Sequence, residues 1–171
     1  MKNIKFLLAF FTLTIAFSIA GFAQNVSLPS LGGQTVSLEN QKGKVVILAL
    51  GASWLPLSAN QATITTDLAN KYRGKDVVLY FVTTDSTAAK SKNFASDAQI
   101  QAFATKNKLT VPVLRDSDGA VVLKNYKVDQ IPSFVILDKD GKIIGEPFGG
   151  VTPTTEKDLA KQIAIKVDGL L

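Results

Sequence analysis

Residues 44–60 read KVVILALGASWLPLSAN, and two patterns in this stretch decide the fold. The first seven residues form an almost continuous apolar run, which is typical of a strand that is covered on both faces of a sheet. A turn of small residues follows, and it leads to Trp54, the only tryptophan of the chain, and to Pro56. Proline is favoured just inside the first turn of a helix. The stretch therefore predicts a central strand that passes through a tight turn into a helix.

The remaining sequence alternates between strand-like and helix-like segments, which predicts one α/β domain with a mixed sheet between helices. A short β segment at residues 34–44 is expected to precede the central strand. The other expected elements are a helix over 57–73, a buried strand over 76–85, a helix that begins at Ser96-Asp97, a short strand with a turn and a single-turn helix over 111–128, a hairpin over 133–148 joined by DKDG at 138–141, and an amphipathic helix over 154–168.

The N-terminus carries the pattern of a secretory signal peptide. Two lysines precede an apolar run from residue 6 to residue 20, and small residues stand where a signal peptidase reads the chain. We predict a signal peptide over 1–23, cleavage before Gln24, and an exported domain over 24–171 that is periplasmic or secreted. The alternative is an uncleaved segment that anchors the chain in the membrane.

The composition excludes several kinds of site. The chain has no cysteine and no histidine, so zinc, copper and haem would lack their usual ligands, and no cofactor or metal is expected. Asp116-x-Asp118-Gly and Asp138-x-Asp140-Gly lack the ligand series of a calcium loop and are interpreted as turns. The net charge is +5, and it falls to +3 without residues 1–23, which hold two of the 19 basic residues and no acidic one. Such a mixed surface does not indicate nucleic-acid binding.

Four stretches together resemble the thioredoxin-like superfamily, and more narrowly its exported TlpA/ResA-like redoxin (AhpC/TSA) branch. They are LENQKGKVVILAL at 38–50, GASWLPLSAN at 51–60, VPVLRDSDGAVVLKNYKV at 111–128 and VDQIPSFVILDKDGKII at 128–144. The resemblance implies a thioredoxin-like α/β fold: a central mixed β-sheet flanked by helices, with an N-terminal β extension. It aligns Leu55 and Ser58 with the two active-site cysteines of the family, Ala49 with a position that often handles protons, and Ile131-Pro132 with a cis-proline step.

These substitutions remove the chemistry of the family. Thiol–disulfide exchange needs a thiolate that attacks sulfur, and neither Leu55 nor Ser58 supplies one. A serine nucleophile would need a base beside it, and the usual base, histidine, is absent from the chain. The resemblance still implies a surface that aligns an extended peptide or protein segment along Ile131-Pro132. The candidate peptide-binding residues are Trp54, Leu55, Pro56, Ser58, Ile131 and Pro132.

Other interpretations stay open from the sequence alone. Trp54 is also explained as a cover for the core, Pro56 as a helix-start residue, Pro132 as a turn residue and Leu55 as a change without consequence. The alternatives to a binding module are a member of the thiol-disulfide oxidoreductase family that borrows a thiol from a partner, and a structural envelope scaffold. The loss of the cysteines is compatible with a natural or an engineered origin.

Overall fold

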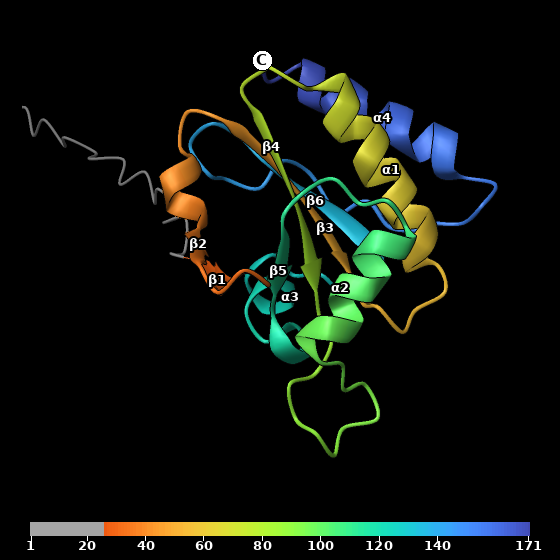
Figure 1. Cartoon of the computed structure of the whole chain (residues 1–171). Coiled ribbons are helices and arrows are strands. Elements are labelled where there is room, and N and C mark those ends of the chain that lie inside the picture. Colours follow the sequence, from red (N-terminus) through yellow and green to blue (C-terminus); the bar gives the residue numbers. More distant parts are fainter. Residues whose placement is uncertain (1–25) are drawn as a thin grey trace, which may run out of the picture.

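The computed structural model describes residues 26–171, so the predicted signal peptide over 1–23 lies outside the described residues (Figure 1). In chain order the elements are β1 (Ser27–Pro29), β2 (Thr35–Ser37), the 3₁₀ helix η1 (Leu38–Gln41), β3 (Val45–Gly51), α1 (Ser58–Lys71), β4 (Val77–Thr83), α2 (Asp97–Lys106), β5 (Val113–Arg115), the 3₁₀ helix η2 (Ser117–Gly119), α3 (Val122–Asn125), β6 (Ser133–Leu137) and α4 (Glu156–Asp168).

The central sheet has the strand order β5-β4-β3-β6. β3 pairs in parallel with β4, and β4 pairs in parallel with β5, whereas β6 runs antiparallel to β3. Every residue of β3 and of β6 is buried, as their apolar sequences require of strands covered on both faces. The predicted mixed sheet with flanking helices is therefore confirmed.

Two hydrophobic layers cover the two faces of the sheet. On one face, α1 and α4 lie side by side (Figure 1), and the hydroxyl of Tyr72, which directly follows α1, donates to the Ala164 carbonyl of α4 at 3.1 Å. On the other face, the side chains of Leu28, Leu38, Val122 and others from β1, η1 and α3 pack against the sheet. Within residues 26–171 no helix combines the length and the apolar character that crossing a bilayer requires.

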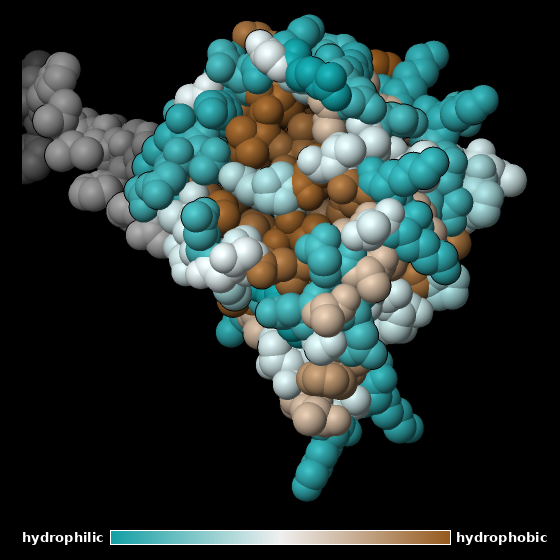
Figure 2. All heavy atoms as spheres, viewed as in Figure 1, coloured by the Kyte–Doolittle hydropathy of each residue, from teal (hydrophilic) through white to brown (hydrophobic). Residues whose placement is uncertain are grey.

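The predicted N-terminal β extension is present as the antiparallel pair β1–β2. Its continuation reaches the outer side of β5, where Ser30 forms a β-bridge with Leu114 and the Leu31 N–H donates to the Val113 carbonyl at 3.2 Å. β5 pairs with only the last three residues of β4, because Pro112 lacks the N–H that would continue the ladder. Figure 2 shows hydrophobic residues gathered at this side of the sheet, between α1 and the β1–β2 pair.

The predicted hairpin over 133–148 is only partly correct. Its first arm is β6, but its second arm makes isolated bridges, Leu137 with Ile143 and Phe134 with Phe148, instead of a continuous strand. Gly145 has a positive φ of 72°, and Pro147 cannot donate to a ladder, so the chain leaves the sheet between the two bridges.

Candidate functional site

The residues between β3 and α1 form a compact turn, which we call the Trp54 turn (residues 52–58). The Leu55 N–H donates to the Ala52 carbonyl at 3.2 Å, and the Ser58 N–H donates to the Leu55 carbonyl at 3.0 Å. These bonds span three residues each, so two tight turns precede the helix. Pro56 therefore lies before α1, which begins at Ser58, and not inside the helix as the sequence suggested.

The Trp54 turn presents apolar side chains to solvent and keeps its serine inside. Trp54 is 48% exposed and Leu57 is 38% exposed, Pro56 is also exposed, and Leu55 is half-buried. Trp54 therefore does not serve mainly as a cover for the core. Ser58 is fully buried, and its Oγ accepts a hydrogen bond from the Ala52 N–H at 3.2 Å. The hydroxyl at the second cysteine-like position thus supports the turn from within.

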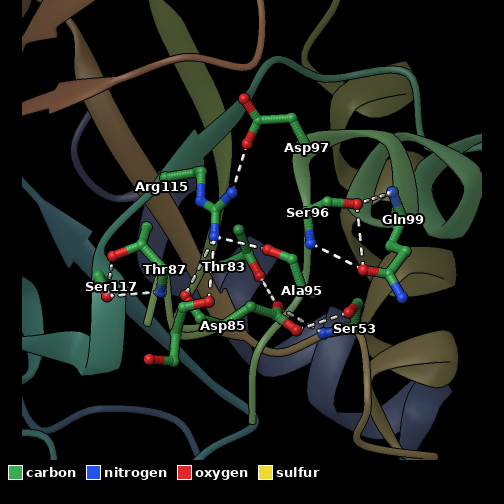
Figure 3. Close-up of polar contacts among 11 residues, drawn as sticks. Ser53, Thr83, Asp85, Thr87, Ala95, Ser96, Asp97, Gln99, Arg115 and Ser117 are labelled. Atoms are coloured by element: carbon green, nitrogen blue, oxygen red, sulfur yellow. Dashed lines mark hydrogen bonds and ion pairs between the residues drawn. The ribbon is translucent and has the colours of Figure 1, made fainter. Parts of the chain in front are cut away.

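A buried carboxylate holds the start of the turn (Figure 3). Asp85, which follows β4 and is fully buried, accepts hydrogen bonds from the Ser53 N–H at 2.8 Å and from the Ser53 hydroxyl at 2.6 Å. The Thr83 hydroxyl donates to the same carboxylate. Buried carboxylates are tolerated where several donors replace water, as these three do. Asp85 therefore fixes the backbone immediately before Trp54.

Arg115 of β5 connects this carboxylate region to the loop between β4 and α2. Its Nη2 donates to the Ala95 carbonyl at 2.8 Å and to the Ser86 carbonyl at 3.4 Å, and its Nη1 pairs with Asp97 in the first turn of α2. Its side chain is only 12% exposed. The guanidinium thus binds both ends of the 86–95 loop, at Ser86 and Ala95, and holds the loop next to the sheet beside Asp85.

A buried amide connects α1 to the proline segment. Gln61 Nε2 donates to the Leu50 carbonyl at 3.1 Å and to the Ser133 carbonyl at 2.7 Å, and so it links α1, β3 and the start of β6. The site requires glycine at position 51, because a Cβ there would lie 2.4 Å from Gln61 Oε1. We call Ser53, Gln61, Thr83, Asp85 and Arg115 the support network.

The peptide bond between Ile131 and Pro132 is cis, as the resemblance implied. Pro132 is buried, whereas Ile131 is half-buried and packs against the core that lies under α3. Among residues 26–171, no hydrogen bond engages the N–H or the C=O of Ile131. Backbone groups that the protein leaves unpaired must be hydrated or must pair with a ligand. Ile131 is thus available for main-chain pairing, and Gln61 fixes the following Ser133 to α1.

Burial raises the pKa of three groups on the α3 side of the sheet, Tyr80, Asp116 and Tyr126. Burial raises the pKa of Asp116, although its carboxylate accepts hydrogen bonds from the backbone N–H groups of Val121 and Val122. Burial also raises the pKa of Tyr126 to about 12. Asp116 holds the entry into α3, which is a structural role, and this agrees with the turn that the sequence predicted at this place.

Comparison with known proteins identifies the family of the chain. The AhpC/TSA family matches residues 19–145, which is well over half of the sequence. The chain belongs to the AhpC/TSA family. It is 28% identical over 154 residues to the thiol-disulfide oxidoreductase ResA of Bacillus thuringiensis subsp. konkukian (strain 97-27), with 90% of this chain and 83% of the relative covered. It is 33% identical over 130 residues to the thioredoxin-like protein YneN of Bacillus subtilis (strain 168), with 76% and 71% covered.

A solved structure supports the fold of this AhpC/TSA chain. The exposed lipoprotein thioredoxin of Streptococcus pneumoniae strain TIGR4 superposes with a TM-score of 0.66 at 26% identity, and the match covers 85% of this chain and 99% of the other. The chain is therefore a thioredoxin-like redoxin that is related to thiol-disulfide oxidoreductases. Thiol–disulfide exchange requires a cysteine thiolate, but the sequence of this chain contains no cysteine.

Sequence reasoning missed the support network. Asp85 lies 32 residues from Ser53, and Gln61 lies 72 residues from Ser133, so no local pattern joins them. One signal was available: Asp85 lies at the end of the predicted strand over 76–85, two residues after the observed end of β4. The carboxyl ends of neighbouring parallel strands meet at one edge of a sheet, so an acidic residue there faces the turn after β3.

Proposed function

We propose that this chain is an exported, non-catalytic module that binds an extended peptide or protein segment at the Trp54 turn and Ile131. One observation carries the proposal: buried hydrogen bonds hold the exposed Trp54 turn in place beside Ile131. The backbone N–H and C=O of Ile131 have no partner among the described residues, and the chain has no thiol. The signal-like residues 1–23 and the similarity to an exposed lipoprotein support export.

Two kinds of contact would hold the ligand. An extended segment that runs past Ile131 can exchange main-chain hydrogen bonds with its N–H and C=O, as in β-strand addition. Trp54 and Leu57 then offer apolar surface to a side chain of the segment. Leucine at position 55 adds to this surface, and it cannot capture the ligand covalently. The expected complex is therefore reversible and independent of redox conditions.

The single tryptophan makes the test direct. We expect extended, partly apolar peptides to change the fluorescence of Trp54 in a saturable manner, with the same affinity in the presence and absence of a reductant. Leu55→Asp places a charge in the apolar surface and should abolish the response. Thr63→Asp, at an exposed position on α1, is the matched control and should leave it unchanged. The absence of a saturable response in the wild-type protein would contradict the proposal.

The relationship to ResA favours one alternative, a thiol-disulfide oxidoreductase that works with a thiol from a partner. Reduction of insulin, measured with the purified chain alone and with an added thiol protein, decides between the two. The binding module gives no turnover above background, because no side chain of the protein can form a mixed disulfide. Turnover that depends on an added thiol protein would instead favour the alternative.

A further inference from the structure

A recess of about 140 Å³ lies beside the Ile131-Pro132 step, and its residues flank the step on both sides in the sequence. It separates the segment before the proline from the second, irregular arm after β6. We call it the Ser133 recess. It is lined by Lys127, Val128, Asp129, Gln130, Ser133, Glu146, Pro147 and Gly149.

The charges of the Ser133 recess differ in sign from those of the whole protein. Asp129 and Glu146 contribute two carboxylates against the one ammonium of Lys127, whereas the chain as a whole has a net charge of +5. None of the three makes an ion pair with another residue of the described part of the chain. The recess therefore offers unpaired acceptors and an excess of negative charge to a ligand.

Ser133, one of the residues that line the recess, carries a buried hydroxyl without a partner among the described residues. Ser133 is only 1% exposed, and its Oγ has no hydrogen-bond partner among the described residues. Phe134 and Ile136 face the α1–α4 core, so alternation along β6 directs Ser133 to the opposite face, the side on which Val128 lies. Buried hydroxyls are normally paired, so this one indicates a missing polar partner.

The Gln130 side chain lies against Gly149 at the wall of the recess. A Cβ at position 149 would lie 2.4 Å from the Nε2 of this exposed side chain, which would then have to shift. The amide of Gln130 adds a further polar group at the wall. Val128 and Pro147 supply apolar surface between the polar groups. A long side chain with an apolar stem and a cationic end matches this arrangement.

We propose that the Ser133 recess is a specificity subsite that receives one basic side chain, lysine or arginine, of the bound segment. The inference rests on the proposed function, because it assigns the side-chain preference of the same peptide site. In a strand that pairs with Ile131, neighbouring side chains of the bound segment point to opposite faces. One side chain can therefore enter the recess while its neighbour in the sequence faces the Trp54 turn. Its cationic group would lie near the carboxylates of Asp129 and Glu146.

The test uses one extended peptide with a single variable position, N-acetylated and C-amidated, and titrated against Trp54 fluorescence. Peptides with Lys or Arg at that position should bind about threefold to fivefold more tightly than the Gln peptide, and the Glu peptide should bind more weakly. The preference should shrink at high salt, because the carboxylates are exposed. A peptide with a free amino terminus and Gln at the variable position tests whether a terminal ammonium is bound instead.

Matched variants of the protein test which residues cause the preference for a Lys peptide over the Gln peptide. Asp129→Asn and Glu146→Gln should each reduce the Lys-over-Gln ratio, and the double variant should abolish it while the affinity for the Gln peptide stays unchanged. Lys127→Gln should increase the ratio. Asp140→Asn, an exposed acidic residue in the turn after β6, is the control and should have no effect.

The outcomes separate the two proposals. If the Gln peptide binds but no preference for Lys or Arg is found, the subsite is refuted while the binding module stands. If the preference survives in the double variant, or only the free amino terminus produces it, the side-chain subsite is also refuted. If no peptide binds at all, both proposals are refuted. A preference for Lys and Arg that disappears in the double variant supports the subsite.

Discussion

The Trp54 turn and the support network beneath it differ in what their side chains do. The family resemblance aligns Leu55 and Ser58 of the turn with two cysteines, and the tryptophan of the turn is half exposed. The network is buried, and its Asp85 and Gln61 form hydrogen bonds to three different parts of the chain. Buried hydrogen bonds thus hold the shape of the turn, and the sequence supplies no thiol there. In the proposed function, the turn contributes shape and not chemistry.

Restoring the two thiols tests this comparison with the largest expected effect. Leu55 and Ser58 are the ends of a tight turn, with the Ser58 N–H 3.0 Å from the Leu55 carbonyl, and such ends lie close enough for a disulfide. We expect the double variant Leu55→Cys/Ser58→Cys to form this disulfide and to reduce insulin, with the thiol at 55 activated by the start of α1.

The single variants are the controls for the restored pair. Leu55→Cys alone should form mixed disulfides without efficient turnover, and Ser58→Cys alone should remain unreactive because position 58 is fully buried. A double variant that folds but neither forms the disulfide nor reduces insulin would show that the network no longer shapes a competent turn.

Removal of the buried carboxylate should have the next largest effect. Asp85→Ala leaves the Ser53 N–H and the Thr83 hydroxyl without an acceptor, and we expect the free energy of unfolding to fall by about 2–4 kcal/mol. Chemical denaturation measures the change. Asp67→Ala, an exposed acidic residue of α1, should stay within about 0.5 kcal/mol of wild type. Equal changes in the free energy of unfolding for the two substitutions would contradict the role of Asp85 in the support network.

Loss of the buried amide should cost less stability but should also disturb binding. Gln61→Leu removes one hydrogen bond from the carbonyl of Leu50 and one from the carbonyl of Ser133, so the free energy of unfolding should fall by about 1–3 kcal/mol. Because Gln61 fixes the residue after Pro132, peptide affinity should fall as well. Gln101→Leu, exposed on α2, should change neither quantity. Unchanged peptide affinity in a destabilised Gln61→Leu variant would contradict the positioning role.

The smallest effect is expected far from the turn, at the end of α4. Hydrogen bonds from Lys71 and Tyr72 lower the pKa of Asp168 below its usual value of 3.8. The stabilisation is therefore fully present above pH 3.8 and is lost as the pH falls through the lower, folded-state pKa. Asp168→Asn should reduce stability slightly at neutral pH and flatten the acid limb of the pH–stability curve, whereas Asp158→Asn should keep that limb. An unchanged limb in Asp168→Asn would exclude the contribution.

Much of the fold could be predicted because local patterns determine it. The continuous apolar runs of β3 and β4 require strands that are covered on both faces, and Ser96 begins α2 with a capping box to Gln99. The second arm after β6 was expected as a strand, because Ile143 and Ile144 favour β structure. Gly145 and Pro147 prevent a continuous ladder there, and local apolar character did not reveal it.

The family resemblance predicted the cis Ile131-Pro132 bond, which the structure confirms, but it did not predict the contacts between distant residues. The peptide-binding role of Leu55, Ser58 and Ile131 stays a prediction. The role of Asp85 depends on two strand ends that meet in space, and the recess depends on how the chain departs from β6. Both are consequences of packing between segments far apart in the sequence, which single-sequence patterns do not encode.

The central claim is that a bound segment pairs with the backbone at Ile131 without any thiol. Amide hydrogen exchange of Ile131, measured with and without a saturating extended peptide, tests it most directly. The account predicts that exchange at Ile131 slows strongly on binding, because its N–H then donates to the peptide. A peptide that saturates the Trp54 signal while exchange at Ile131 stays unchanged would contradict it.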